Sequence, residues 1–183
     1  MSAYRATWVL LGVLLSMCFA NDASANNRED ELKLAFTYNI ARFVTWPERA
    51  AGDQSEYFHL CILGDTPYRI AMDNLGKRRV ADLPIEVIDL ARPPADGVRC
   101  DLAYLSAESG DVPGVIEALL AETVLTVSDA PGFANTGGII ELTRRNDRIA
   151  MRINVAAVRR AGLTISSQLL SLATLVGDET GAY

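Results

Sequence analysis

The chain has 183 residues, of which 50% are hydrophobic and 22% are charged, and its formal net charge is -6. This composition is that of a globular protein long enough to bury one core. The negative charge argues against nucleic-acid partners, because binding to phosphates needs a basic face that displaces counterions.

The first 25 residues have the pattern of an export signal. Arg5 supplies a positive charge, and the run from Trp8 to Ala20 is almost wholly apolar but short for a bilayer span. Ala23-Ser24-Ala25 then has the small-x-small spacing of a signal-peptidase site. We expect a cleaved signal peptide over residues 1–25 and a soluble, periplasmic domain over residues 26–183. An uncleaved membrane anchor is the alternative.

The mature chain begins with a helix and continues with alternating elements. Asn27 to Thr45 carries two apolar stripes, which predict a helix buried on two sides, and Trp46-Pro47 ends it. Strands that alternate with helices favour right-handed crossovers and a largely parallel sheet. The apolar runs predict strands over residues 57–63, 84–90, 102–105 and 124–127, and helices over residues 67–75 and 112–121.

The last third has a different pattern. Residues 139–142 and 149–155 alternate around a polar turn, which is typical of an antiparallel hairpin with one covered face. A helix capped by Asn154 and ended by Gly162 follows, and an amphipathic helix is predicted over residues 165–176. The expected fold class is α/β: a single domain with a mixed, mostly parallel sheet, helices on both faces and a C-terminal antiparallel hairpin.

Two cysteines, Cys61 and Cys100, remain once Cys18 leaves with the signal peptide. In an oxidising compartment such a pair indicates one disulfide, which is worth about 4 kcal/mol in the chain-entropy model. Two buried free thiols are the alternative. The chain has no Cys-x-x-Cys motif, so a thioredoxin-like role has no support.

The glycine-rich stretch SDAPGFANTGGII, residues 128–140, has two glycines at the spacing of a phosphate-binding P-loop. A P-loop requires Lys and then Ser or Thr after its second glycine, and it leads into a helix. Gly138 and Ile139 occupy those places, and a strand follows. The stretch is therefore interpreted as a turn and not as a nucleotide site.

This turn is expected to contain a very short helix. Pro131 would open it, Ser128 or Asp129 would cap it, and Gly137-Gly138 would supply the freedom to re-enter the sheet. Phe133 would pack inward as a plug.

The sequence contains few candidates for catalytic or metal-binding residues. His59 lies in a strand pattern without a partner cluster, so a structural role is favoured over a catalytic one. No Gly-x-Ser-x-Gly or His-Glu-x-x-His motif is present, and no soft-metal set is available. We therefore expect no enzyme, no catalytic residue, no metal and no cofactor. Arg144-Arg145 is interpreted as a solvated turn.

Two carboxylates suit a small-molecule cleft. Asp65 and Asp129 each follow the carboxyl end of a predicted strand, where α/β sheets bind ligands. Together with Ser128 they are the candidate ligand-binding residues. Their alternative role is that of helix caps.

Four segments resemble the YfiR family of bacterial periplasmic proteins, and the likeness runs from Leu32 to Val176. The family resemblance implies an α/β domain without known catalysis, usually dimeric. The four segments are YNIARFVTWP (Tyr38 to Pro47), CILGD (Cys61 to Asp65), LTVSDAPGFANTGGIIEL (Leu125 to Leu142) and INVAAVRRAGLTISSQLLSLA (Ile153 to Ala173).

The resemblance also implies a function. Such a protein represses an inner-membrane diguanylate cyclase of the YfiN type through contact with its periplasmic domain. This contact lowers cyclic di-GMP and biofilm formation, and an outer-membrane lipoprotein of the YfiB type relieves it. Cys61 and Cys100 match the family's disulfide bridge, whereas a second cysteine pair that some members carry near the terminal hairpin is missing here. A periplasmic small-molecule-binding sensor is the other functional class that stays open.

Overall fold

The computed structural model describes residues 32–47, 55–63, 75–90, 99–107, 112–119, 123–145 and 148–177. The predicted signal peptide and Asp65 lie outside these residues. So does the predicted helix over residues 67–75, apart from its last residue, Leu75.

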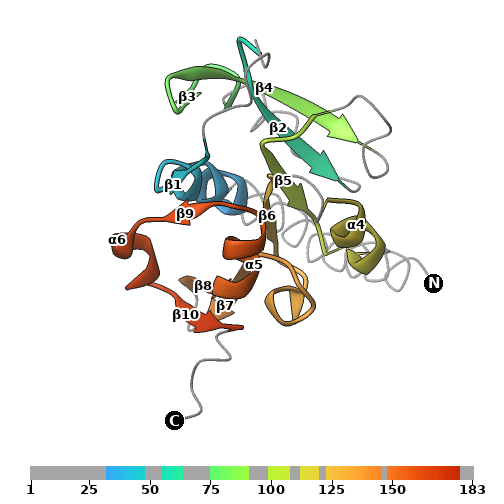
Figure 1. The fold of residues 1–183 in the computed structure, drawn as a ribbon, viewed down its shortest axis with the longest axis vertical. Helices are drawn as coiled ribbons and strands as arrows, with labels where there is room; N and C mark the ends of the chain where they lie inside the picture. The colour runs from blue at the N-terminus through green and yellow to red at the C-terminus, as the bar shows by residue number, and fades with distance from the viewer. Residues whose placement is uncertain are drawn as a thin grey trace, which may run out of the picture.

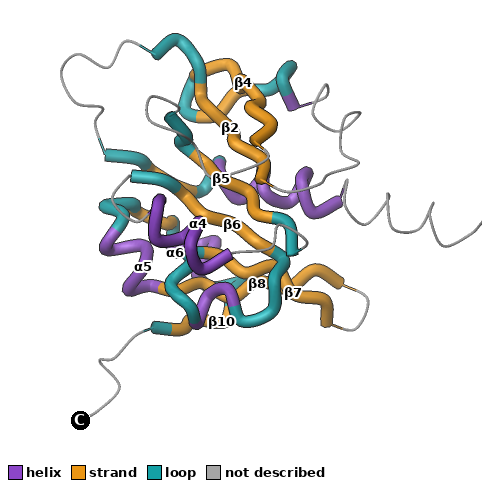
Figure 2. The backbone as a smooth tube through the Cα atoms, turned by 90° about the vertical axis from the view of Figure 1, so that its right-hand side faces the viewer, coloured by secondary structure: helices purple, strands orange, loops and turns teal. Residues whose placement is uncertain are grey.

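Eight strands form one curled sheet in the order β10-β8-β7-β6-β5-β2-β4-β3. The strands follow one another down the molecule from β4 to β10 (Figure 2). A second sheet of two strands pairs β1 (Val44–Thr45) with β9 (Thr164–Ile165). The strands of the large sheet are β2 (Phe58–Leu63), β3 (Arg79–Val80), β4 (Leu83–Leu90), β5 (Leu102–Leu105), β6 (Leu125–Ser128), β7 (Ile140–Arg145), β8 (Arg148–Asn154) and β10 (Thr174–Val176).

The central strands β4, β2, β5, β6 and β7 are mutually parallel. Their order along the chain is second, first, third, fourth and fifth, the order of flavodoxin-like doubly wound sheets. β8 turns back antiparallel to β7, and β10 then runs parallel to β8. The predicted α/β class, with a mostly parallel sheet and a hairpin near the C-terminus, is confirmed (Figure 1).

Helices cover both faces of this sheet. Successive strand residues point to opposite sides, so both faces carry apolar side chains that pack against helices. Residues 32–41 are helical, and Leu34 and Ile40 of that helix share a buried cluster with Leu60 and Ile62 of β2. The intervening β2 residues Cys61 and Leu63 face the other side, where they belong to a second cluster. That cluster also contains Val115, Ile116 and Leu119 of α4 (Val112–Leu119).

The end of the chain differs from the prediction. α5 (Val155–Arg160) forms as expected, with the side chain of Asn154 accepting a hydrogen bond from the backbone N–H of Ala157. The predicted helix over residues 165–176 is wrong. The chain instead makes a four-residue helix, α6 (Ser167–Leu170), and then enters β10. All three residues of β10 pair with β8, so their backbone groups form hydrogen bonds with that strand. This pairing stabilises a strand more than the helical spacing of the apolar residues favours a helix.

Candidate functional site

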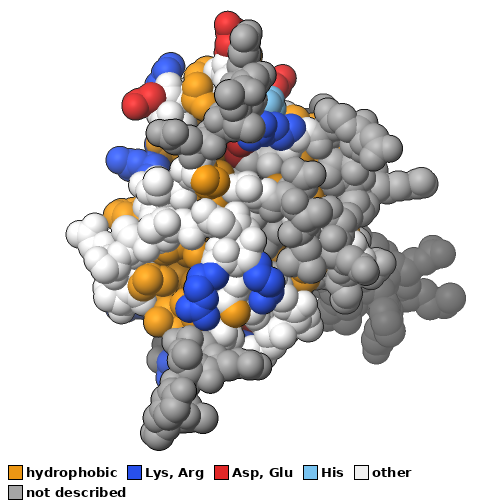
Figure 3. All heavy atoms as spheres, in the orientation of Figure 1, with side chains coloured by type: hydrophobic (Ala, Val, Ile, Leu, Met, Phe, Trp, Pro, Cys, Tyr) orange, Lys and Arg blue, Asp and Glu red, His pale blue; other side chains and the backbone are white. Residues whose placement is uncertain are grey.

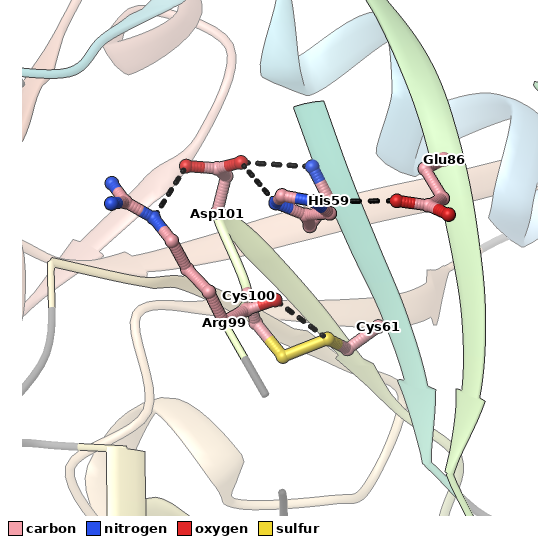
Figure 4. The surroundings of a disulfide bond; sticks show 6 residues. All are labelled: His59, Cys61, Glu86, Arg99, Cys100 and Asp101. Carbon is pink, nitrogen blue, oxygen red and sulfur yellow. Dashed lines mark hydrogen bonds and ion pairs between the residues drawn. A yellow bond between two sulfur atoms is a disulfide. The ribbon is translucent and has the colours of Figure 1, made fainter. Parts of the chain in front are cut away.

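A disulfide joins Cys61 of β2 to Cys100, which lies two residues before β5. The two Cα atoms lie 5.7 Å apart, and the bond closes a separation of 39 residues. β2 and β5 are neighbours in the sheet, so the bond links two strands that also share backbone hydrogen bonds (Figure 4).

His59 lies close to this disulfide, between two carboxylates (Figure 4). Its Nε2 is 3.3 Å from Glu86 Oε2 on β4, and its Nδ1 is 3.5 Å from Asp101 Oδ2. The backbone N–H of His59 donates to the same Asp101 oxygen at 2.8 Å, and Arg99 Nε lies 3.7 Å from the other oxygen. The expectation that His59 has no partner cluster is therefore wrong, and the contacts support the structural role that was favoured for it.

The two carboxylates of this cluster lie at opposite ring nitrogens of His59. Within the described residues, no three His, Cys, Asp or Glu side chains are placed so that they could hold one ion. Asp101 is buried, and its bond to the His59 backbone fixes the start of β5 against β2.

Asp129 lies at the carboxyl edge of the sheet, as predicted from its position after β6. Its Oδ2 is 2.7 Å from Lys33 Nζ of the first helix, and its Oδ1 accepts a hydrogen bond from the backbone N–H of Ala107 at 2.8 Å. The aspartate therefore ties the helix over residues 32–41 to the segment after β5. The neighbouring switch point of the sheet lies between β2 and β5, where the Ser106 N–H donates to the Leu63 carbonyl.

Ser128 lies in β6 and is fully buried. Its hydroxyl accepts a hydrogen bond from the backbone N–H of Ala130 at 3.0 Å. Neither Ser128 nor Asp129 caps the short helix of this stretch, so that prediction is wrong. The helix is the 3-10 turn η1 (Phe133–Asn135), and Gly132 occupies its N-cap without a side-chain hydrogen bond.

A buried carboxylate that the sequence reasoning missed, Glu141 of β7, binds the start of this turn instead. Its oxygens accept hydrogen bonds from the backbone N–H groups of Gly132 at 3.2 Å and Ala134 at 3.0 Å. Arg152 on β8 lies 3.3 Å from the same carboxylate and donates to the Asn135 side chain at 2.9 Å. The carboxylate therefore acts in place of the missing cap.

The rest of the loop is fixed by packing. Phe133 is buried, which confirms the predicted plug, and a Cβ added at Gly138 would collide with its ring. Asn154 donates to the Ala134 carbonyl at 2.7 Å while it caps α5. The glycines and polar residues of this stretch thus hold the loop in one shape.

The protein is a mixed α/β domain. Its buried polar side chains Asp101, Glu141 and Asn154 form hydrogen bonds that hold loops and strands together. A YfiR/HmsC-like family model matches residues 30–174. The chain therefore belongs to the YfiR/HmsC-like family.

Comparison with solved structures agrees on the fold. The chain is similar to the crystal structure of a conserved domain protein from Vibrio cholerae O1 biovar El Tor strain N16961, with a TM-score of 0.51 and 13% sequence identity. The match covers 78% of this chain and 59% of that chain. A search of curated proteins found no match.

Membership in the YfiR/HmsC-like family suggests a periplasmic regulator of cyclic di-GMP signalling. Such a family is regulatory rather than catalytic. In the part of the chain that the structure describes, no helix has the length and apolar character needed to cross a membrane.

Proposed function

We propose that this protein represses a membrane-bound diguanylate cyclase by direct contact on the periplasmic side, without turnover. The observation that carries the proposal is the family match, which spans residues 30–174 of the 183. The cyclase acts in the cytoplasm, so the coupling would run through the partner's membrane helices as a shift between two states.

The energy that this mechanism requires is modest. A repressor that favours the inactive state by about 2.7 kcal/mol changes the ratio of the two states roughly a hundredfold. One or two buried apolar anchors in an interface supply that much.

Deletion of the gene tests the proposal. We expect cyclic di-GMP and surface attachment to rise in the deletion strain and to return to their original levels when the exported protein is supplied. The matched control is the same gene without the codons for residues 1–25. Equal complementation by this cytoplasmic form would contradict contact in the periplasm.

A second candidate function is sensing of a small molecule at the carboxyl edge of the sheet, near Ser128 and Asp129. Asp65, the third candidate residue from the sequence, lies outside the described residues. The flavodoxin-like strand order favours this function, because such sheets bind ligands at this edge next to the switch point. A ligand that engages Asp129 would compete with Lys33 for its oxygen. Native mass spectrometry of protein purified from periplasm should then show an adduct that Asp129→Asn weakens. A bare mass in both proteins would contradict this role.

A further inference from the structure

Two large apolar side chains are exposed where the described chain ends. Leu172, between α6 and β10, is 74% exposed, and Leu175 in β10 is 48% exposed. One exposed leucine needs no explanation, because folded proteins carry many. These two are three residues apart, and hydrophobic side chains gather on the surface over the segment from α6 to β10 (Figures 1 and 3).

A basic pair lies beside this apolar surface. Arg159 and Arg160 are exposed at the end of α5, and α5 contacts β10. Figure 3 shows Lys and Arg side chains over α5, next to the hydrophobic ones. The stretch from residue 148 to residue 177 contains four arginines and no Asp, Glu or Lys, whereas the whole chain has a net charge of -6. The local charge is therefore opposite in sign to that of the chain.

The third observation is the open edge of the sheet. β10 is the last strand in the order, and no strand in the described part of the chain pairs with its outer side. An edge strand presents backbone N–H and C=O groups that can pair with another chain, and native proteins commonly protect such edges with charges or proline. β10 consists of Thr174, Leu175 and Val176, so it has neither a charge nor a proline, and its short length limits an added strand to a few backbone hydrogen bonds.

We propose that the C-terminal surface, defined by Arg159, Arg160, Leu172 and Leu175, docks an extended acidic segment of another protein, which adds to β10 as a strand. Apolar side chains of the segment would cover the leucines, and its carboxylates would pair with the arginines. Backbone pairing supplies affinity in strand addition, while side chains and opposite charge supply specificity. The inference rests on the proposed function, because the segment would belong to the signalling partner that the protein holds inactive.

Two double variants test the surface in a strain that lacks the chromosomal gene. One is Leu172→Glu with Leu175→Glu, and the other is Arg159→Glu with Arg160→Glu. We expect each exported variant to keep the wild-type melting temperature and to leave cyclic di-GMP near the level of the deletion strain. The matched control is Tyr57→Glu, which changes a 45% exposed aromatic residue next to β2, on the far side of four intervening strands, and should repress fully.

The outcomes separate this inference from the proposed function. If the wild-type protein leaves cyclic di-GMP unchanged, the proposed function fails. If the wild-type protein represses and both folded double variants repress equally well, the C-terminal surface is not the docking site and the proposed function stands.

Two further measurements distinguish the occupant. Sedimentation equilibrium that shows a wild-type dimer and a monomeric leucine variant would overturn the inference in favour of a second copy of this chain. Flotation of the purified wild-type protein, but not of the arginine variant, with phosphatidylglycerol vesicles would overturn it in favour of a lipid surface. Unchanged oligomeric state and no flotation, together with lost repression, support a protein segment.

Discussion

The buried carboxylate of Glu141 should be one of the most sensitive positions in the domain. Replacement by glutamine keeps the size but removes the charge that faces Arg152, and it turns one acceptor into a donor that opposes a backbone N–H. An unsatisfied buried donor or acceptor costs about 1–3 kcal/mol. We expect Glu141→Gln to lower the melting temperature by about 2–4 °C for each kcal/mol lost, as measured by circular dichroism.

The matched control for this change is Glu86→Gln. Glu86 also contacts a basic side chain, that of His59, but its own side chain is 53% exposed. Exposed ion pairs contribute little because water screens them. An equal loss of stability in both variants would show that burial and the bonds to the loop are not what makes Glu141 important.

The roles of single residues were only partly predictable from the sequence. The inward packing of Phe133 follows from an aromatic ring in a tight turn, and the cap at Asn154 follows from its place before a helix. Glu141 gave no signal because its partners come from a different element, and in sequence it is simply a polar residue after an apolar run. Asp129 was singled out from its place after a strand, but its ion pair with Lys33 was not predictable, because it joins residues 96 positions apart.

At the scale of elements, the hairpin between β3 and β4 has an unfavourable turn sequence. Its two central residues, Ala81 and Asp82, both have positive φ angles, 48° and 64°. Such a turn prefers Asn-Gly, and a left-handed conformation costs an ordinary L-residue about 1–2 kcal/mol. The double variant Ala81→Asn with Asp82→Gly should therefore raise the midpoint of urea unfolding by an amount that corresponds to about 1 kcal/mol or more.

A control at another loop tests whether the turn conformation is the cause. The same glycine introduced at Ala107, an exposed residue after β5, should not stabilise the chain. A gain of equal size there would mean that the effect is not specific to the hairpin.

The disulfide links β2 to the start of β5 and should be structural. The chain-entropy model gives about 4 kcal/mol for a loop of this length, and measured effects commonly fall below the model. We expect the double variant Cys61→Ser with Cys100→Ser to melt at least several degrees lower than the wild-type protein. Thiol labelling of the unfolded, non-reduced protein without residues 1–25, and so without Cys18, should find no reactive cysteine, and two labelled thiols would refute the bond.

The elements themselves were largely predictable, with two informative exceptions. The first helix was predicted to continue to Thr45, but it ends at residue 41, and Val44–Thr45 form β1 because they pair with β9. The strands around Leu60, Leu102 and Leu125 are short apolar runs between turn residues, so local sequence is sufficient to define them. The final helix was predicted wrongly because Ile165, Leu169 and Leu172 have helical spacing. Whether β8 has a free edge to pair with β10 depends on the whole sheet, and no local pattern contains that information.

At the scale of the whole molecule, we expect the mature chain to form a homodimer through its first helix. Leu32 in this helix is 52% exposed and Phe43 in the turn after it is 41% exposed, so two apolar side chains of this region remain uncovered. Sedimentation equilibrium at tens of micromolar should give twice the chain mass, and Leu32→Glu should shift the species to a monomer. Leu172→Glu, at the opposite end of the described chain, should leave the dimer intact. A monomeric wild-type protein would refute the expectation.

The small sheet of β1 and β9 has a consequence for the time course of folding. It pairs Val44 with Ile165 and Thr45 with Thr164, so a strand near the start of the described chain is hydrogen-bonded to a strand near its end. A chain that emerges from a ribosome or through a membrane channel with its N-terminus first has no partner for β1 until residue 165 has appeared. Contacts between such distant positions also form late, because closing a long loop costs entropy before the contact repays it. The first helix can contact β2 and Asp129 as soon as these have emerged. β1, which follows that helix, would stay unpaired until residues 164 and 165 arrive.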